Sequence, residues 1–323
     1  MLHLRITAPA ELTDQAVELL TADPAVTNLI HLPGAAIRPE GDVLLADVAR
    51  EAANQIIDEL RALGIPEAGS IHVDPARTWL SRAGFDADRR TPGSSADSVV
   101  WAEVTQRAYE ESELNWTYLS FMVLATLIAS IAIILDSQIL VIGAMVLGPE
   151  FVPIATLGLA VVRRRKTLFG IAARTLVVGF VVAIAIAALA ALAARGLGWV
   201  HADDVTADRT STTFIYHPDK FSFLVALIAA AAGVLALTSS KVGGLSGVFI
   251  SVTTVPAAGN VALGLAFGIS HEIWGSTLQL VLNISGMVLA GWLTLALQAA
   301  VWAWMSARRE RLVSRRGSRP RRP

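Results

Sequence analysis

One carboxylate lies in the middle of an otherwise apolar stretch. Residues 137–162 read SQILVIGAMVLGPEFVPIATLGLAVV, and the apolar run is interrupted only by Gly148-Pro149-Glu150 and by Pro153. Proline removes a backbone donor and clashes with the preceding turn, so these prolines predict a helix that is broken about halfway across a bilayer. An ionisable side chain at that depth is costly unless protein or water satisfies it. Glu150 is therefore the first candidate for a site that binds a cation or a proton.

Glu150 also has a purely structural interpretation. It directly follows Pro149, so it could begin the second half of the broken helix. There the positive end of the helix dipole stabilises a carboxylate or a bound anion. The carboxylate would then cap the half-helix and pair with a basic side chain such as Lys241 or Arg174. The sequence leaves both interpretations open.

A second broken stretch follows later in the chain, at residues 242–268. It is long and apolar, with interruptions at TTVP and at the Gly-Asn pair that follows. Hydroxyls, an amide and carbonyls freed by a break suit a hard cation or a polar solute. Alternatively, the stretch is a structural kink in which threonine side chains bond back to the helix. The candidate binding residues of this stretch are Thr253, Thr254, Pro256 and Asn260.

Further polar residues form a second tier of candidates. Asp136 ends the first apolar segment, where a helix cap or a turn is the main interpretation and ion access is the alternative. Ser239 and Lys241 lack the Gly-x-x-x-x-Gly-Lys-[Ser/Thr] spacing of a phosphate loop, so they predict a cytoplasmic turn. Asn283 is expected to bridge helices or to line a path. Arg174, inside a predicted membrane segment, is expected to snorkel back to the interface.

Composition places the chain among polytopic membrane proteins. Its 323 residues are 54% hydrophobic and 16% charged, with a mean hydropathy of +0.56, which is too apolar for a soluble globule. Cysteine is absent, which excludes disulfides, thiolate metal sites and cysteine nucleophiles. The apolar half carries no motif that would position a catalytic base or a metal, so we expect no enzyme, no cofactor and no metal site.

The apolar half predicts six membrane segments. Basic residues gather in RRRK at 163–166, at Lys241 and in the tail at 305–323. By the positive-inside rule these parts are cytoplasmic, so we expect a multi-pass cell-membrane protein with both termini in the cytoplasm. Each half contains three segments, an odd number, so the second half must enter the membrane from the opposite face. This predicts a 3+3 inverted repeat with one broken helix in each half. The segments are 117–135, 137–162, 167–194, 221–240, 242–268 and 276–304.

The first 75 residues predict a small, acidic α+β domain. Amphipathic spacing indicates helices at 11–22 and 49–63, and the turn-rich residues 33–41 separate two strands. The resulting β-α-β-β-α-β order is typical of a ferredoxin-like split βαβ fold, which usually senses small molecules or dimerises. Alternating apolar residues indicate the strands, at 2–7, 26–32, 42–48 and 70–73.

The remaining parts connect this cytoplasmic domain, residues 1–75, to the membrane. Residues 76–116 predict a polar linker followed by a juxtamembrane helix, and the transmembrane domain then covers 117–304. The arginine-rich tail is expected to contact anionic lipid. Pairs of small residues permit close helix contacts, so a homo-oligomer is expected. Aromatic candidates for the interfacial belt are Trp101, Tyr109, Trp116 and Tyr118.

Three runs make the apolar part recognisable: ESELNWTYL, IAIILDSQILVIGAMVLGPEFVPI and TSSKVGGLSGVFISVTTVPAAGN. From about residue 110 to residue 300 the chain resembles the prokaryotic membrane proteins catalogued as domain of unknown function 389, the uncharacterised hydrophobic domain family. This resemblance implies a polytopic helical architecture and a membrane location. It implies no particular substrate.

These features predict a secondary-type permease for a small polar solute or ion, with its site where two broken helices meet near the bilayer midplane. The N-terminal domain would regulate the permease or dimerise it. An ion channel of the same architecture is the first alternative, with the breaks as a filter. A membrane-anchored ligand sensor is the second, although a passive anchor has no need of two broken helices. The expected partners are the lipid bilayer, a small solute or ion and further copies of the chain, whereas nucleic acid is not expected.

Overall fold

The chain forms two compact units. In the computed structural model, residues 1–76, 78–91, 93, 98–206, 215, 220–239 and 253–317 are described. One unit, here called the head unit, comprises 1–104 with 238–241 and 298–323. The other, here called the helical body, comprises 105–237 and 242–297.

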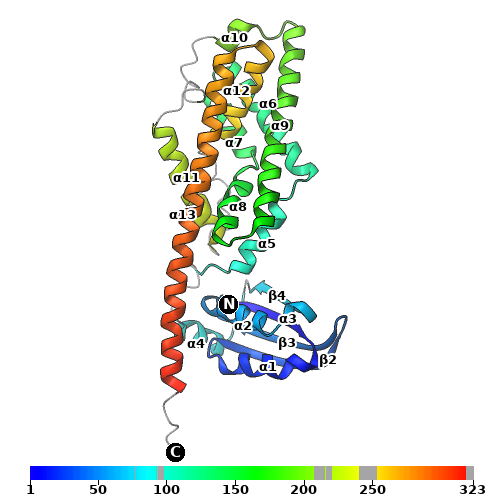
Figure 1. Ribbon diagram of the computed structural model, residues 1–323, viewed down its shortest axis with the longest axis vertical. Coiled ribbons are helices and arrows are strands. Elements are labelled where there is room, and N and C mark those ends of the chain that lie inside the picture. The colour runs from blue at the N-terminus through cyan, green and yellow to red at the C-terminus, as the bar shows by residue number, and fades with distance from the viewer. Residues whose placement is uncertain are drawn as a thin grey trace, which may run out of the picture. The chain divides into compact units, whose positions relative to one another are not determined.

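The head unit contains a four-stranded antiparallel sheet in the order β2-β3-β1-β4 (Figure 1). Each neighbouring pair of strands is antiparallel, which is the arrangement of a split βαβ unit. The strands are β1 (Leu2–Ala8), β2 (Val26–Ile37), β3 (Glu40–Val48) and β4 (Ser70–Pro75). The connecting helices are α1 (Ala10–Ala22), η1 (Arg50–Ala52), α2 (Ala53–Ala62) and α3 (Ile65–Ala68).

The core of the head unit lies between the sheet and these helices. Successive side chains of a strand point to opposite faces, so alternate residues of β1 share one face. Leu2, Leu4 and Ile6 are fully buried there. Leu20 of α1 and Ile56 of α2 belong to the same apolar cluster. The apolar residues that alternate along the strand and those spaced along the helices therefore pack into one core.

Strand β2 is longer than the sequence indicates. The expected turn at 33–41 is shorter, because β2 continues to Ile37 and pairs with β3 through an irregular register. Gly34 adopts a φ of +61°, and its N–H donates to an oxygen of the Asp42 carboxylate at 2.7 Å. His31 Nε2 lies 2.9 Å from the other carboxylate oxygen. The Gly34 N–H, and then the His31 ring, hold the pKa of Asp42 below its ordinary value.

The residues predicted as a polar linker include a helix. Helix α4 (Arg82–Arg90) begins after Ser81, whose hydroxyl accepts from the Gly84 N–H at 3.1 Å. Helix α5 (Trp101–Glu111) follows where a juxtamembrane helix was predicted. Trp101 is buried, so its assignment to the interfacial belt is wrong.

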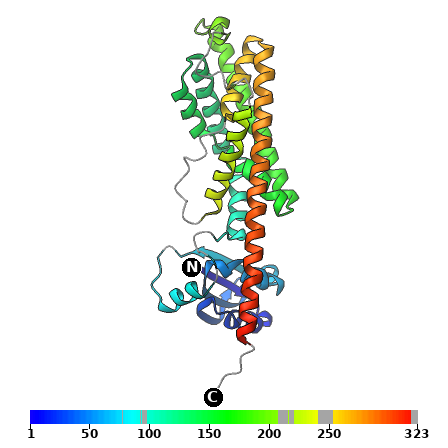
Figure 2. The same ribbon diagram turned by 90° about the vertical axis from the view of Figure 1, so that its left-hand side faces the viewer.

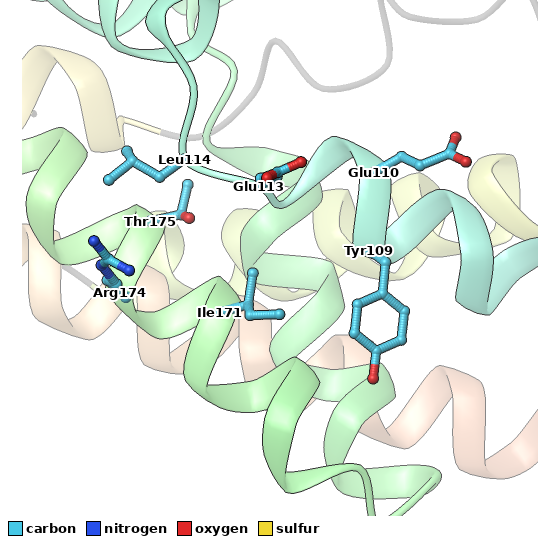
Figure 3. Close-up of a pocket in the computed structure, with 7 residues that line it drawn as sticks. All are labelled: Tyr109, Glu110, Glu113, Leu114, Ile171, Arg174 and Thr175. Carbon is cyan, nitrogen blue, oxygen red and sulfur yellow. The ribbon is translucent and has the colours of Figure 1, made fainter.

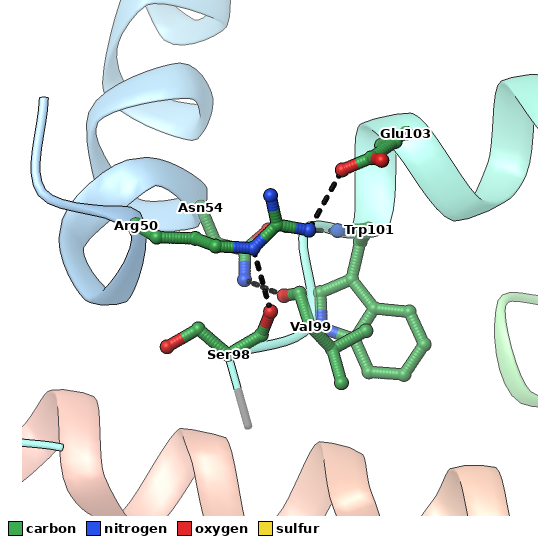
Figure 4. Close-up of polar contacts among 6 residues, drawn as sticks. All are labelled: Arg50, Asn54, Ser98, Val99, Trp101 and Glu103. Carbon is green, nitrogen blue, oxygen red and sulfur yellow. Dashed lines mark hydrogen bonds and ion pairs between the residues drawn. The ribbon is translucent and has the colours of Figure 1, made fainter. Parts of the chain in front are cut away.

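A buried arginine fastens the start of α5 within the head unit (Figure 4). Arg50 is 7% exposed, and its Nε donates to the Ser98 carbonyl at 3.1 Å. Its Nη2 donates to Glu103 at 2.8 Å. Asn54 adds a second clamp, because its amide donates to the Val99 carbonyl at 2.6 Å. Charge-assisted bonds of this kind are about twice as strong as neutral ones, so Arg50 is the main anchor.

Three of the remaining helices are long and apolar enough to cross a membrane: Trp116–Ile134, Lys166–Gly196 and Ser270–Trp304. A fourth candidate is a pair, Gln138–Leu147 and Phe151–Val162, which is bent by 52° at a short break. Two further apolar helices are shorter, so six spans and an inverted repeat stay predictions. The helices are α6 (Trp116–Ile134), α7 (Gln138–Leu147), α8 (Phe151–Val162), α9 (Lys166–Gly196), α10 (Ala202–Thr206), α11 (Lys220–Thr238), α12 (Thr254–Phe267) and α13 (Ser270–Gly317).

Small residues let these helices approach closely. Helix α6 packs against α7, α9 and α12, and α9 also packs against α8 and α12 (Figures 1 and 2). A Cβ on Gly158 of α8 would lie only 2.8 Å from the Trp292 nitrogen of α13, so these two backbones are in direct contact. Arg195 of α9 donates to the Ala266 carbonyl at 3.0 Å and so satisfies the end of α12. The buried small-residue stripe of α9 is Ala183, Ala187 and Ala191.

We expect Arg50→Ala to loosen residues 98–104 from the rest of the head unit. The loss of bonds from a buried cation costs about 1–3 kcal/mol, so hydrogen exchange of these amides should rise by about tenfold or more. Arg61→Ala is the control, because it removes only an exposed ion pair at 3.6 Å. Equal exchange in the two variants would show that Arg50 is not the anchor.

The β2–β3 turn should lose protection in acid through Asp42. A lowered folded-state pKa contributes stability that is complete above the unfolded value near 3.9 and is lost as the pH falls through the folded value. Hydrogen exchange of amides 34–42, corrected for intrinsic rates, should therefore show a loss of protection below about pH 4. In Asp42→Asn the protection should already be low at neutral pH and should not change with acid. An unchanged acid response in that variant would contradict the assignment.

Candidate functional site

In each apolar stretch a helix begins at or beside the predicted interruption. Helix α7 is capped by Gly148, and α8 begins after Glu150. Helix α12 begins after Thr253. Pro153 and Pro256 are each the third residue of their helix, where a missing N–H is tolerated because first-turn N–H groups have no partner within the helix. Each proline therefore fits the start of a half-helix.

The break in the first stretch is narrower than the sequence indicates. Pro149 lies in the break between α7 and α8, whereas Pro153 is buried inside α8. In the second stretch Asn260 also lies inside a helix, so it causes no second interruption. The residues that precede Thr253 in that stretch, 242–252, lie outside the described residues.

One hydrogen bond joins the two stretches. Thr254 Oγ1, in the first turn of α12, donates to Glu150 Oε1 at 2.6 Å. Glu150 is only 6% exposed. Its Oε2 is also buried, and it has no hydrogen-bond partner among the residues that the structure describes. A half-satisfied carboxylate in an apolar interior is where a proton, a cation or a polar ligand would bind.

The backbone at the break allows this approach. A Cβ on Gly148 would lie 2.7 Å from Val255 Cγ2 of α12 and would also contact the Glu150 carboxylate. A larger residue at position 148 would therefore require the side chains of Val255 and Glu150 to shift. The side chain of Glu150 does not cap its own helix, so the capping interpretation is not what the structure shows. The carboxylate lies instead against the start of the other half-helix.

The Tyr118 side chain of α6 interacts electrostatically with the Glu150 carboxylate. Its ring packs on Gly179 of α9, where a Cβ would lie 2.7 Å from the ring. The Tyr118 hydroxyl oxygen is buried and, like Glu150 Oε2, has no hydrogen-bond partner in the described part of the chain. The expectation that Tyr118 belongs to an interfacial belt is therefore wrong. Buried polar atoms of this kind call for an ordered water or a ligand.

Polar residues of α13 continue from the second break. Asn283 Nδ2 donates to Thr253 Oγ1 at 2.9 Å, and Gln279 Nε2 lies 3.4 Å from the same hydroxyl. The predicted helix bridge at Asn283 thus leads directly to the candidate site. Thr253 holds the N-cap position of α12, so these amides lie at the positive end of that half-helix.

A second buried carboxylate belongs to the same interface. Asn260 Nδ2 donates to Glu272 Oε2 at 2.6 Å and to Ser276 Oγ at 2.7 Å. Glu272 lies in the first turn of α13, where the helix dipole stabilises its charge. Four residues of α13 share one helix face by their i, i+4, i+7, i+11 spacing, and each is 5% exposed or less. This polar stripe is Glu272, Ser276, Gln279 and Asn283.

Three residues of the stripe were not candidates from the sequence. Glu272 falls between the predicted segments 242–268 and 276–304, whereas α13 already begins at Ser270. Ser276 and Gln279 were not singled out. Polar residues that recur with helical spacing in an apolar run are the signal that could have found them.

Among the other candidates, Asp136, Ser239 and Arg174 belong to other elements. Asp136 forms the turn between α6 and α7 with a φ of +44°, a conformation that aspartate tolerates. Ser239 follows α11 in the head unit, and Lys241 lies outside the described residues. Arg174 is exposed, and no ion pair between described residues joins it to Glu150.

Thr254→Val should destabilise the helical body, because it removes the hydrogen bond to Glu150. Without the hydroxyl, no side chain among the described residues donates to Glu150, and the helical body should lose about 1–2 kcal/mol of stability. Thermal unfolding in detergent measures the loss. Thr254→Ser keeps the donor and should stay close to wild type. Equal destabilisation by Ser and Val would show that the methyl group matters rather than the hydrogen bond.

Comparison with known proteins gives one match. A family model described as Domain of unknown function (DUF389) matches residues 145–289. No curated protein and no solved structure matches the chain. The matched residues include Glu150, Thr254 and the polar stripe of α13. The resemblance indicated by the sequence motifs is therefore confirmed. Residues 145–289, which include the buried carboxylate, match the DUF389 family.

Proposed function

We propose that this chain is a multi-pass permease for a small polar solute or ion, and that Glu150 binds the transported species. The hydrogen bond from Thr254 to Glu150 carries this proposal, because it joins the starts of two half-helices at one carboxylate. Two half-helices that begin near the midplane, with polar groups between them, are typical of transporter sites. A carboxylate has no structural reason to be buried there half-satisfied.

The polar stripe of α13 supports a path toward this site. From Glu272 to Asn283 the helix rises by about 16 Å, roughly half of a hydrocarbon core of about 30 Å. The stripe runs from the end of α13 that follows the α12–α13 connection to Thr253 beside the site. Buried amides and hydroxyls in this order would replace the hydration of a polar species as it moves inward.

An inverted repeat would place the two half-helices symmetrically. Helices α6, α7–α8 and α9 form a first set, and α11, α12 and α13 form a second set with a related order. Both half-helices carry proline as their third residue, and both contain the run LGLA, at 157–160 and 263–266. In this arrangement both termini would lie in the cytoplasm of a cell-membrane protein, and copies of the chain would form a homo-oligomer.

The surroundings of Glu150 favour transport over an ion channel and over a membrane-anchored sensor. A filter of an ion channel needs a continuous polar pore, whereas the contacts around Glu150 are direct hydrogen bonds between packed side chains. A sensor with a passive anchor would gain nothing from two half-helices and a buried acid. The head unit would then regulate or dimerise the permease. Nothing in this proposal requires a catalytic group or a cofactor.

Glu150→Gln is expected to abolish flux of the transported species. The amide keeps the size of the side chain but cannot carry a charge, so uptake into proteoliposomes should fall by at least about tenfold. A panel of ions and small solutes, screened first by thermal stabilisation of the purified protein, names the species to test. Deletion of residues 1–75 is the companion variant, and its flux should persist. Stabilisation that is equal in wild type and Glu150→Gln and is lost with the head would support the sensor instead.

A further inference from the structure

A pocket of about 450 Å³ lies between the end of α5 and α9, and its lining includes neither Glu150 nor Thr254 (Figure 3). Its lining carries charges of both signs. Glu110 and Glu113 come from the end of α5 and the loop that follows, and Arg174 comes from α9. Tyr109 adds a phenol group. All these residues belong to the helical body.

The opposite charges in this pocket do not neutralise one another. In the described part of the chain neither Glu113 nor Arg174 forms an ion pair, and Glu110 accepts only from the Gln106 amide at 2.8 Å. Figure 3 shows Arg174 and Glu110 at opposite ends of the lining residues, with Ile171 between them. A pocket with separated positive and negative ends complements a ligand whose own charges are separated in the same way.

The sequence of α9 places this pocket at the edge of the bilayer. Helix α9 has 31 residues and is about 46 Å long, which exceeds a hydrocarbon core of about 30 Å. Residues 175–194 are uncharged, with Arg174 and Arg195 directly before and after them. This stretch of 20 residues spans about 30 Å. A span over these 20 residues begins later than the predicted segment 167–194 and would place Arg174 at the level of the lipid headgroups.

The floor of the pocket is connected to buried polar groups. Thr175 Oγ1 donates to the Ser112 carbonyl at 2.7 Å, and Ser112 Oγ donates to Thr156 Oγ1 of α8 at 2.9 Å. All three residues are buried. These bonds hold the end of α5 against α8 and α9, so the charged residues of the pocket are presented by a fixed framework. A ligand bound there should stabilise the helical body as a whole.

We propose that this pocket binds a zwitterion that carries a primary ammonium and a phosphate. The planar guanidinium of Arg174 suits a phosphate, to which it can donate two parallel bonds. The carboxylates of Glu110 and Glu113 accept from the three N–H donors of an ammonium. Phosphoethanolamine has this chemistry both as a lipid headgroup and as a free solute. The site does not depend on the proposed transport function.

The test measures thermal stabilisation of the full chain in nanodiscs of phosphatidylglycerol. Free phosphoethanolamine is titrated into one series, and phosphatidylethanolamine or phosphatidylcholine is included in the bilayer of two others. The readout is the shift relative to the ligand-free midpoint of each variant, so a change in basal stability does not enter. Arg174→Gln and Glu113→Gln should weaken the response by about tenfold or more. Arg107→Gln is the matched control on α5, outside the pocket lining.

Each outcome decides the proposal. A shift with free phosphoethanolamine that both pocket variants lose and Arg107→Gln keeps supports a soluble ligand. The same variant pattern seen only with phosphatidylethanolamine supports the lipid headgroup. The proposal is overturned by the absence of any shift, or by equal responses of Arg174→Gln and Arg107→Gln. Equal shifts with phosphatidylcholine also overturn it, because a quaternary ammonium has no N–H to donate to the glutamates.

Discussion

A carboxylate that is removed from water must be matched by donors, and this requirement shapes the centre of the helical body. Glu150 lies at the break between α7 and α8, and among the described residues its one side-chain donor is Thr254 at the start of α12. The donor is a side-chain hydroxyl in the first turn of α12, and the break after Gly148 gives that turn room to approach the carboxylate. The interruption between α7 and α8 thus places the carboxylate against the first turn of α12.

Close backbone packing follows from the same requirement. Gly148 lets the first turn of α12 approach the break, and Gly158 lets α8 approach α13. On the other side of α12, amides from α13 reach Thr253, and Asn260 reaches Glu272. Helix α12 is therefore held by polar contacts along its length rather than by apolar packing alone. Such contacts would have to exchange partners if α12 moves during a transport cycle, and this gives the proposed function a physical basis.

The sequence predicted the head sheet and the break beside Glu150 because both rest on local signals. Alternating residues define β1, and proline beside Glu150 marks the break. Contacts between distant helices left weaker signals. Glu272 falls between two predicted segments, yet Gly268 takes a left-handed φ of +73° and α13 begins two residues later.

Aromatic residues near a predicted membrane edge were misassigned for a related reason. An amphipathic ring suits an interface as well as a core, so composition alone cannot decide between them. Trp101 is buried beside Asn54 in the head unit, and Tyr118 is buried against Gly179 in the helical body. The neighbours that bury them come from far along the chain. Only the tertiary packing distinguishes the two cases.

The central claim is that the two half-helices share one buried carboxylate, and a double-mutant cycle tests it most directly. Stability is measured for wild type, Glu150→Met, Thr254→Val and the double variant by the same unfolding assay. The structure predicts a coupling free energy of about 1–2 kcal/mol, because Thr254→Val should cost little once its acceptor is gone. Strictly additive effects, with Thr254→Val equally costly in both backgrounds, would contradict the account.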